Sequence, residues 1–267
     1  LYKKFIMIGI IGQGFVGNAV YQKFKNYYDV LTYDLDESKC NSNVNEIICN
    51  CTNIFVCLPT PMNKVGSCNI SIVEQVLTGI DLTTDNLETE RNIIIKSTIP
   101  PGTTAKWNRR FESLNIVFNP EFLTEANAVS DYENQDRIIL GGVRPATTEL
   151  KTIFSKVFPK AHIIKTDSTH AEMVKYLTNS FLATKVSFAN EMYQICEGLG
   201  VDYDKVIEYA TQDERLGDSH WNVPGPDGDF GYGGHCFPKD VKALMVVAED
   251  MDIIPLMLAA TDVKNNE

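Results

Sequence analysis

The chain has 267 residues, of which 44% are hydrophobic and 22% charged, a composition typical of one large or two modest globular domains. Its net charge of −11 argues against a general nucleic-acid-binding protein, which needs basic residues to contact phosphates. No apolar stretch reaches the roughly 18 residues of a membrane span. Seven cysteines without regular spacing indicate thiols in a reducing, cytoplasmic compartment, and we expect no metal site among them.

The first part of the chain alternates short apolar stretches with helical patterns. The expected strands are Phe5–Ile11, Asp29–Tyr33, Ile54–Leu58, Asn92–Lys96, Ile116–Phe118, Arg137–Leu140 and His162–Ile164. Strands that alternate with helices are typical of a parallel sheet covered by helices. We therefore interpret residues 1–167 as one Rossmann-like domain.

Residues 168–267 are predicted to form a small helical domain. Thr169 and Glu172 have the spacing of a capping box, which would begin a helix that continues to about Leu199. At about 30 residues this helix exceeds the usual length in globular proteins, so we expect it to be a spine between domains or subunits.

Two further helical regions are expected beyond this long helix. A shorter helix is predicted at Tyr203–Tyr209, and helical segments continue from Pro238 to the end of the sequence. A loop rich in glycine and proline, Gly217 to Gly234, lies between them. The fold class is therefore α/β, a Rossmann-like parallel-sheet domain followed by a helical domain with a long central helix.

The first expected strand leads directly into a glycine motif, G-x-G-x-x-G. Such glycines permit a tight turn, a close approach to a pyrophosphate and close packing of helix on strand. An aspartate at the end of the second strand suits the ribose hydroxyls of NAD and would repel the extra phosphate of NADP. The predicted cofactor residues here are Gly12, Gly14, Phe15, Val16, Gly17 and Asp34. A plain glycine turn or a site for S-adenosylmethionine are the alternatives to NAD.

Four further clusters carry polar residues suited to catalysis. Lys96–Gly102 and Asn119–Glu125 each follow an expected strand, where the ligand crevice of a parallel sheet lies. Lys175 and Asn179 are four residues apart and share one helix face. The stretch from residue 231 to residue 240 places a cysteine at an expected helix start, where a lowered thiol pKa would suit a nucleophile.

Each cluster also has a plain structural interpretation. Lys175 and Asn179 could form a solvated helix face, Glu121 and Glu125 could be ordinary loop acids, and Cys236 could be a buried thiol. What argues against coincidence is that all four clusters follow an NAD motif in this order.

These motifs together resemble the UDP-glucose/GDP-mannose dehydrogenase family, which oxidises the sugar of a nucleotide sugar twice, from alcohol to acid, with two NAD. The resemblance covers nearly the whole chain. The segments that carry it are Gly12–Gly17, Leu58–Pro61, Lys96–Pro100, Asn119–Glu125, Lys175 with Asn179, and Gly233–Asp240.

The resemblance implies a covalent mechanism. Cys236 would attack the aldehyde formed in the first oxidation, giving a thiohemiacetal and then a thioester that water hydrolyses. Lys175 would stabilise negative charge on the substrate oxygen, and Asn179 would position that oxygen. Asp240 with Thr98 would hold a water for proton transfer.

The remaining family positions are assigned in the same way. Glu121 would assist hydrolysis and contact the substrate, while Thr60, Thr98 and Glu125 would lie against NAD. Arg215 and Gly233 would contact a nucleotide sugar, with UDP-glucose expected first, and Arg215 would reach it across a homodimer formed through the long helix. His220, in the loop before Cys236, is a weaker candidate for a sugar or phosphate contact.

Two departures from the family matter. The loop from Arg215 to Cys236 is expected to be longer than in many relatives and to lie near the substrate, and the other departure concerns the C-terminal domain. Family members usually continue into a C-terminal nucleotide-binding domain, and we expect this chain, which begins at Leu1 and stops at Glu267, to lack it. One alternative is a single-step 3-hydroxyacid dehydrogenase of the 6-phosphogluconate type, which needs no cysteine. The other is a catalytically idle NAD-binding fragment.

Overall fold

A computed structural model describes residues 6–85, 87, 89–234 and 236–267. The chain divides into two compact units, one comprising Leu1–Pro61 and Asn69–Lys175 and the other Met62–Cys68 and Tyr176–Glu267. The division falls inside the long helix α7 (Ser168–Leu199), whereas the predicted domain boundary lies at the start of that helix. Among the described residues, no helix has the length and apolar character needed to cross a membrane.

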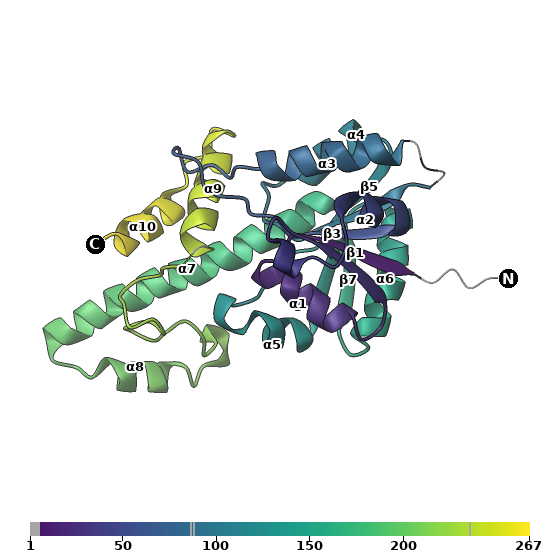
Figure 1. Cartoon of the computed structure of the whole chain (residues 1–267). Helices are drawn as coiled ribbons and strands as arrows, with labels where there is room; N and C mark the ends of the chain where they lie inside the picture. Colours follow the sequence, from purple (N-terminus) through teal and green to yellow (C-terminus); the bar gives the residue numbers. More distant parts are fainter. Residues whose placement is uncertain (1–5, 86, 88, 235) are drawn as a thin grey trace. The chain divides into compact units, whose positions relative to one another are not determined.

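The first unit is built on one sheet of seven strands, and the seven expected strands are confirmed (Figure 1). Their order across the sheet is β2-β1-β3-β4-β5-β6-β7, and β1 to β5 run parallel to one another. The strands are β1 (Met7–Ile11), β2 (Asp29–Tyr33), β3 (Asn53–Val56), β4 (Arg91–Ile95), β5 (Leu114–Phe118), β6 (Arg137–Gly141) and β7 (His162–Thr166).

The sheet departs from the fully parallel arrangement at β6. This strand pairs antiparallel with β5 through Phe118 and Gly141, and β7 then pairs parallel with β6. A parallel crossover needs a dozen or more residues that usually form a helix along the sheet. The only α-helix between β5 and β6 is α5 (Ala128–Glu133), and six residues make a helix about 9 Å long. So short a helix does not bring the chain back along the sheet.

Helices cover both faces of this sheet. Helices α1 (Phe15–Phe24), α5 and α6 (Arg144–Val157) share one hydrophobic cluster. The opposite cluster contains residues of α2 (Val44–Asn50), α3 (Ser71–Thr84) and α4 (Thr103–Arg110). Alternate strand residues divide between the two clusters, for example Phe55 on one side and Ile54 with Val56 on the other. Both faces of the sheet are therefore buried.

The start of α7 differs from the predicted capping box. The helix begins at Ser168, and the backbone N–H of His170 donates to the carboxylate of Asp167, so Thr169 lies inside the helix. Glu172 is fully buried and accepts hydrogen bonds from the backbone N–H groups of Gly102 and Thr104 instead. The long helix thus caps the N-terminus of α4, because those first amides have no partner within α4 itself.

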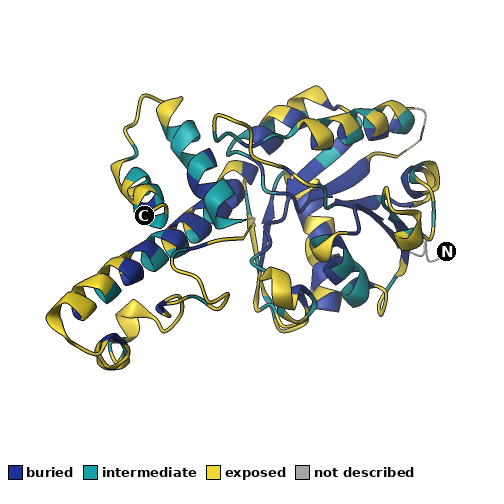
Figure 2. Cartoon of the chain, turned by 60° about the vertical axis from the view of Figure 1, so that its left-hand side comes forward, coloured by how far each residue is buried: buried dark blue, intermediate teal, exposed yellow. Residues whose placement is uncertain are grey.

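The second unit is helical. After α7 it contains α8 (Tyr203–Ala210), α9 (Phe237–Glu249) and α10 (Leu256–Asn265), with a short 3₁₀ turn, η3 (Glu214–Leu216), between α8 and α9. Gly200, which has φ of +69°, follows the last residue of α7, as expected for a glycine that ends a helix. Figure 2 shows buried and exposed positions alternating along α7.

Candidate active site

The glycine motif makes the sharp turn between β1 and α1. Gly12 has φ of +93°, and a Cβ atom there would lie 2.4 Å from the carbonyl oxygen of Cys57. A Cβ at Gly17 would lie 1.8 Å from the carbonyl oxygen of Gly12. Both positions therefore require glycine, one for backbone conformation and close packing and the other for close packing alone.

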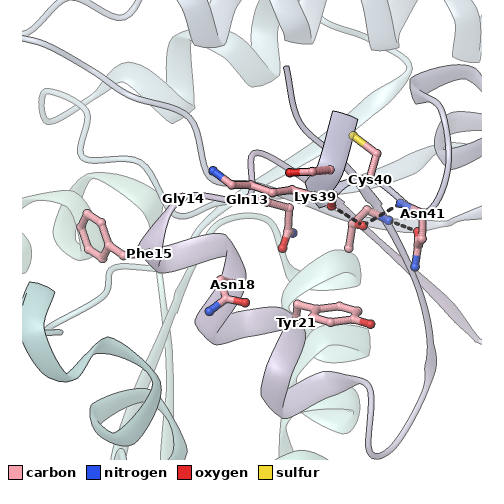
Figure 3. Close-up of a pocket in the computed structure, with 10 residues that line it drawn as sticks. Gln13, Gly14, Phe15, Asn18, Tyr21, Lys39, Cys40 and Asn41 are labelled. Atoms are coloured by element: carbon pink, nitrogen blue, oxygen red, sulfur yellow. Dashed lines mark hydrogen bonds between the residues drawn. The ribbon is translucent and has the colours of Figure 1, made fainter. Parts of the chain in front are cut away.

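Gly14 has a different role, because a Cβ there would meet no atom within 4 Å. It is the N-cap residue of α1, and no side chain caps that end. The first amides of α1 therefore face an open surface, which suits a pyrophosphate. A cavity of about 540 Å³ lies beside this helix. Figure 3 shows Gln13 and Gly14 on one side of it and Lys39 to Asn41 on the other, with Asn18 and Tyr21 from the next turns of α1.

Asp34 follows β2 at the same end of the sheet. Its carboxylate accepts hydrogen bonds from the backbone N–H groups of Gln13 (2.6 Å) and Asp36 (2.9 Å). Partial burial acts to raise the pKa of Asp34, but these two amides and the nearby charge of Lys39 lower it overall. The carboxylate is therefore ionised at neutral pH and tied to the glycine turn. An ionised acid at this position fits the ribose hydroxyls of a dinucleotide.

The segments after β3 and β4 are joined by hydroxyl hydrogen bonds. Ser97 Oγ donates to the carbonyl of Leu58 at 2.7 Å and accepts from its N–H at 2.9 Å. Thr60 Oγ1 donates to the carbonyl of Thr98 at 2.8 Å. The expected cofactor residues Thr60 and Thr98 therefore lie together at the carboxyl end of the parallel strands, the usual ligand-binding edge.

Glu121 and Lys175 form a buried ion pair. Lys175 Nζ donates to Glu121 Oε1 at 3.0 Å and to the Glu121 carbonyl at 2.7 Å, and these residues are 3% and 7% exposed. Burial acts to raise the pKa of Glu121, but Lys175, the backbone N–H of Leu123 and the charge of Lys96 together lower it. Glu121 is consequently ionised, and it can act as a base or hydrogen-bond acceptor.

A second lysine lies buried behind this pair. Lys96 is 2% exposed, and its Nζ donates to Asn119 Oδ1 at 3.0 Å while Asn119 Nδ2 donates to the Ile139 carbonyl at 2.7 Å. Its ammonium also lies 5.3 Å from the centre of the Tyr132 ring. Burial lowers the pKa of Lys96 to about 8, although Glu121 acts to raise it. Two ammonium groups thus flank one carboxylate in this unit.

The second unit contains a further buried polar cluster. Asp240 is fully buried, and its carboxylate accepts from Asn179 Nδ2 at 2.6 Å and from Lys239 Nζ at 2.7 Å. Cys236 is the N-cap residue of α9, the helix that carries Lys239 and Asp240 in its first turn. The expected cysteine at a helix start is therefore confirmed, and the positive end of a helix favours a thiolate there.

Other predicted residues are not drawn into these clusters. The Arg215 guanidinium is exposed and pairs with the carboxylate of its neighbour Asp213. Glu125 and Gly233 are also exposed. His220 has φ of +67°, and burial lowers its pKa, as does the charge of Lys185. His235, within the cysteine motif, lies outside the described residues.

Several residues of these clusters had no assigned role in the sequence analysis. Lys96 could have been found, because a lysine directly after the three isoleucines 93–95 of a central strand must extend into buried surroundings. Lys39 and Asn41 line the cavity beside α1, but Lys39 ends a short 3₁₀ turn (Glu37–Lys39) and Asn41 follows it, in a stretch with no periodic pattern. Glu172 was predicted to complete a capping box with Thr169, and the role it has instead depends on α4, which is far away in the sequence.

Comparisons with known proteins agree with this geometry. Residues 39–161 match the NAD binding domain of the UDP-glucose/GDP-mannose dehydrogenase family, and residues 169–267 match its central domain. UDP-glucose 6-dehydrogenase AglM of Haloferax volcanii is 30% identical, over 97% of this chain and 70% of that relative. UDP-glucose 6-dehydrogenase of Rickettsia bellii is 33% identical, over 93% of this chain and 57% of that relative.

The fold is also similar to that of solved structures. The structure of a UDP-glucose dehydrogenase from Pyrobaculum islandicum superimposes with a TM-score of 0.88 at 25% identity. The match covers 100% of this chain and 69% of that one. The chain thus spans between 57% and 70% of the length of these three proteins.

Proposed function

The chain belongs to the UDP-glucose/GDP-mannose dehydrogenase family, and we propose that it oxidises C6 of a nucleotide sugar to a carboxylate with two NAD per sugar. UDP-glucose is the substrate we propose first, because the relatives AglM and that of Rickettsia bellii are named UDP-glucose 6-dehydrogenases. The observation that carries the proposal is the buried ammonium of Lys175, held against the ionised Glu121 at a ligand-binding edge of the sheet.

NAD, when bound, accepts a hydride from C6 in each of the two oxidations. In the first, the hydroxyl proton passes to a water held by Thr98 and Asp240, and an aldehyde forms. Lys175 stabilises the negative charge that develops on the substrate oxygen, and Asn179 donates a hydrogen bond to it. A buried, fixed cation suits this task because it needs no reorganisation during the reaction.

The second oxidation proceeds through a covalent bond to the protein. The thiolate of Cys236 adds to the aldehyde carbon, and the resulting oxyanion is protonated to give a thiohemiacetal. Loss of a second hydride from C6 and of the hydroxyl proton leaves a thioester. Water then attacks the thioester carbonyl, assisted by the Glu121 carboxylate as base, and releases the acid and the thiol.

The remaining assigned residues bind the ligands. Thr60, Thr98 and Glu125 contact the cofactor, and Arg215 and Gly233 contact the nucleotide sugar. The guanidinium of Arg215 is exposed and pairs with the carboxylate of Asp213. Because a guanidinium binds phosphate oxygens as well as carboxylate oxygens, Arg215 suits the diphosphate of a nucleotide sugar.

A second copy of the chain is the partner we propose for α7. In the part of α7 that belongs to the second unit, five exposed apolar residues lie at spacings of four and seven, which places them in one stripe. They are Leu177, Phe181, Phe188, Ile195 and Leu199, with exposures of 60%, 64%, 49%, 48% and 72%. A stripe with this spacing suits packing against an identical helix, so we propose a homodimer.

The stoichiometry of NAD reduction tests the proposed reaction. Purified protein is incubated with a limiting amount of UDP-glucose and excess NAD, and the NADH formed per sugar is counted while the product is identified by mass spectrometry. Two NADH and UDP-glucuronic acid are expected. With Cys236→Ser, the thioester cannot form, so the second oxidation should be lost.

A single NADH per sugar with a keto or aldehyde product would contradict the proposal and favour the single-step dehydrogenase. Normal turnover by Cys236→Ser would do the same. Cys196→Ser is the matched control, because this thiol is buried in a hydrophobic cluster of the helical unit and should leave the stoichiometry at two.

A further inference from the structure

We infer that Asn265 is a positioning residue that holds the cysteine segment in place without touching substrate. The cysteine segment is defined here as the described residues 231–234 and 236. Asn265, the last residue of α10, accepts a hydrogen bond from the Tyr232 N–H through Oδ1 at 2.6 Å and donates through Nδ2 to the Tyr232 carbonyl at 3.0 Å. One side-chain amide therefore satisfies both backbone groups of one residue, as a neighbouring β-strand would.

The side chain of Tyr232 provides a second attachment. It is 6% exposed and packs in a cluster with Ala183 of α7 and Val241 of α9. Its ring centre lies 6.1 Å from that of Phe237, the residue after Cys236, at an interplanar angle of 78°. The two rings thus pack Tyr232 against Phe237, the first residue of α9 and the one that follows Cys236.

A second asparagine holds the residue before Tyr232. Asn190 of α7 is 7% exposed, and its Oδ1 accepts from the Gly231 N–H at 3.1 Å while its Nδ2 donates to the Val186 carbonyl at 2.9 Å. Gly231 has φ of +75°, and a Cβ there would lie 2.6 Å from Asn265 Oδ1. Both amides therefore approach the backbone closely at a position that only glycine allows.

Asn265 is itself held on a docked helix. Thr261, one turn earlier in α10, is 3% exposed, and its Oγ1 lies 2.9 Å from Thr184 Oγ1. Ser187 Oγ donates to the Thr261 carbonyl at 2.9 Å. These hydrogen bonds join α10 to α7. The amides of Asn265 and Asn190, one from each helix, therefore bind the cysteine segment from two helices that contact each other.

The position of Cys236 matters because it is the N-cap residue of α9. A thiolate there gains from the partial positive charge of the helix N-terminus, an effect that falls off within one turn. Loss of the amide clamp should let the segment move and weaken this effect. The expected consequences are a smaller thiolate fraction at neutral pH and, if the proposed function holds, a lower kcat with unchanged NAD affinity.

Alkylation of the thiol as a function of pH tests this role. The variants Asn265→Ala and Asn265→Asp are treated with iodoacetamide between pH 6 and 10, and the peptide containing Cys236 is quantified by mass spectrometry. We expect the midpoint of its alkylation profile to rise by about half a unit to one unit, which lowers the thiolate fraction at pH 7 about threefold to tenfold. Asn265→Asp keeps the acceptor for the Tyr232 N–H and should show a smaller shift.

Two controls separate this effect from general damage. Asn266→Ala removes the adjacent asparagine, whose amide donates only to the Asp262 carbonyl of its own helix, and should leave the profile unchanged. Cys49 is exposed and lies in the other unit, so its alkylation in every variant serves as the internal reference.

An unchanged Cys236 midpoint in Asn265→Ala would overturn the inference, even if the melting temperature falls, because Asn265 would then only help to dock α10. If Asn265→Ala does not fold, the near-isosteric Asn265→Asp decides by the same measurement. The alkylation profile measures the thiol itself and does not depend on the proposed reaction. Normal formation of two NADH by Cys236→Ser would contradict the proposed reaction, but it would not change the outcome of the alkylation test.

Discussion

Lys175 Nζ lies 3.0 Å from Glu121 Oε1, and each of these side chains is less than a tenth exposed. This pair joins the start of α7 to the segment after β5, two elements of the same unit. Water does not screen these buried charges. If one partner is removed, the desolvation free energy of the remaining charge is no longer offset by the ion pair, and the folded state is destabilised.

Lys175→Met should therefore destabilise the protein by about 3–5 kcal/mol, because it leaves the Glu121 carboxylate buried beside one lysine fewer. Urea unfolding at pH 7 measures the change. The double variant Lys175→Met with Glu121→Gln should recover part of the loss, since no unpaired carboxylate remains. If the free energy of unfolding of Lys175→Met lies within about 1 kcal/mol of that of the parent, the ion pair contributes little to stability.

The pH dependence of stability should reveal the lowered pKa of Lys96. Above about pH 8 the folded protein releases this proton, while the unfolded chain keeps it until about pH 10.5. The unfolded state then binds more protons, so the free energy of unfolding should rise with pH across this window, by up to about 3 kcal/mol. Lys96→Met should lack this rise in urea titrations between pH 7 and 10.5.

Lys106→Met is the control for that titration, because Lys106 is an exposed residue of α4 and its removal should leave the pH slope as in the parent. The same slope in Lys96→Met and in the parent would mean that Lys96 remains charged in the folded protein throughout this range.

Asp34→Ala should weaken NAD binding and reduce the preference over NADP. The ionised carboxylate can accept charge-assisted hydrogen bonds from ribose hydroxyls, each worth about 1.5–3 kcal/mol, so the dissociation constant should rise about tenfold to a hundredfold. Calorimetry with both cofactors measures this. Asp29→Ala, at the opposite end of β2, should bind NAD as the parent does. Equal affinities in Asp34→Ala and the parent would exclude Asp34 from the cofactor site.

Phe181→Glu should weaken self-association. This side chain is 64% exposed and belongs to the apolar stripe on α7. At a symmetric interface the substitution would bury one carboxylate from each of the two copies. Sedimentation equilibrium should show a dimer for the parent and a dissociation constant at least about tenfold higher for the variant. Leu82→Glu, at a 65% exposed leucine of α3, should leave association unchanged. A dimer that survives Phe181→Glu must form elsewhere.

Much of the architecture could be predicted from periodicity. The apolar stretch Asn92–Lys96 and its counterparts were recognisable because strands buried on both faces are continuously apolar, and β4 is confirmed at Arg91–Ile95. The glycine motif could also be recognised from the sequence, because close contacts with neighbouring backbone atoms require glycine at positions 12 and 17. The long helix and its end at Gly200 followed from its length and the glycine stop.

The misjudged features depend on distant partners. Thr169 and Glu172 have the spacing of a capping box, but Glu172 caps α4 because two amides about seventy residues away lack acceptors. The reversed direction of β6 follows from the short α5, whose length no strand pattern reveals. Asn265 lies next to Asn266 in a polar stretch that carries no motif, and only the fold shows that Asn265 contacts Tyr232.

The amide clamp on Gly231 and Tyr232 also bears on how such a protein can diversify. Residues between Gly217 and Phe230 join the chain upstream of the clamp, so changes in the length of this stretch need not move the backbone of Gly231 and Tyr232. Selection for a different sugar could therefore change that stretch while the position of the Cys236 sulfur stays the same. The residues that react with the sugar and the residues that recognise it could then change at different rates, although they lie in one continuous part of the chain.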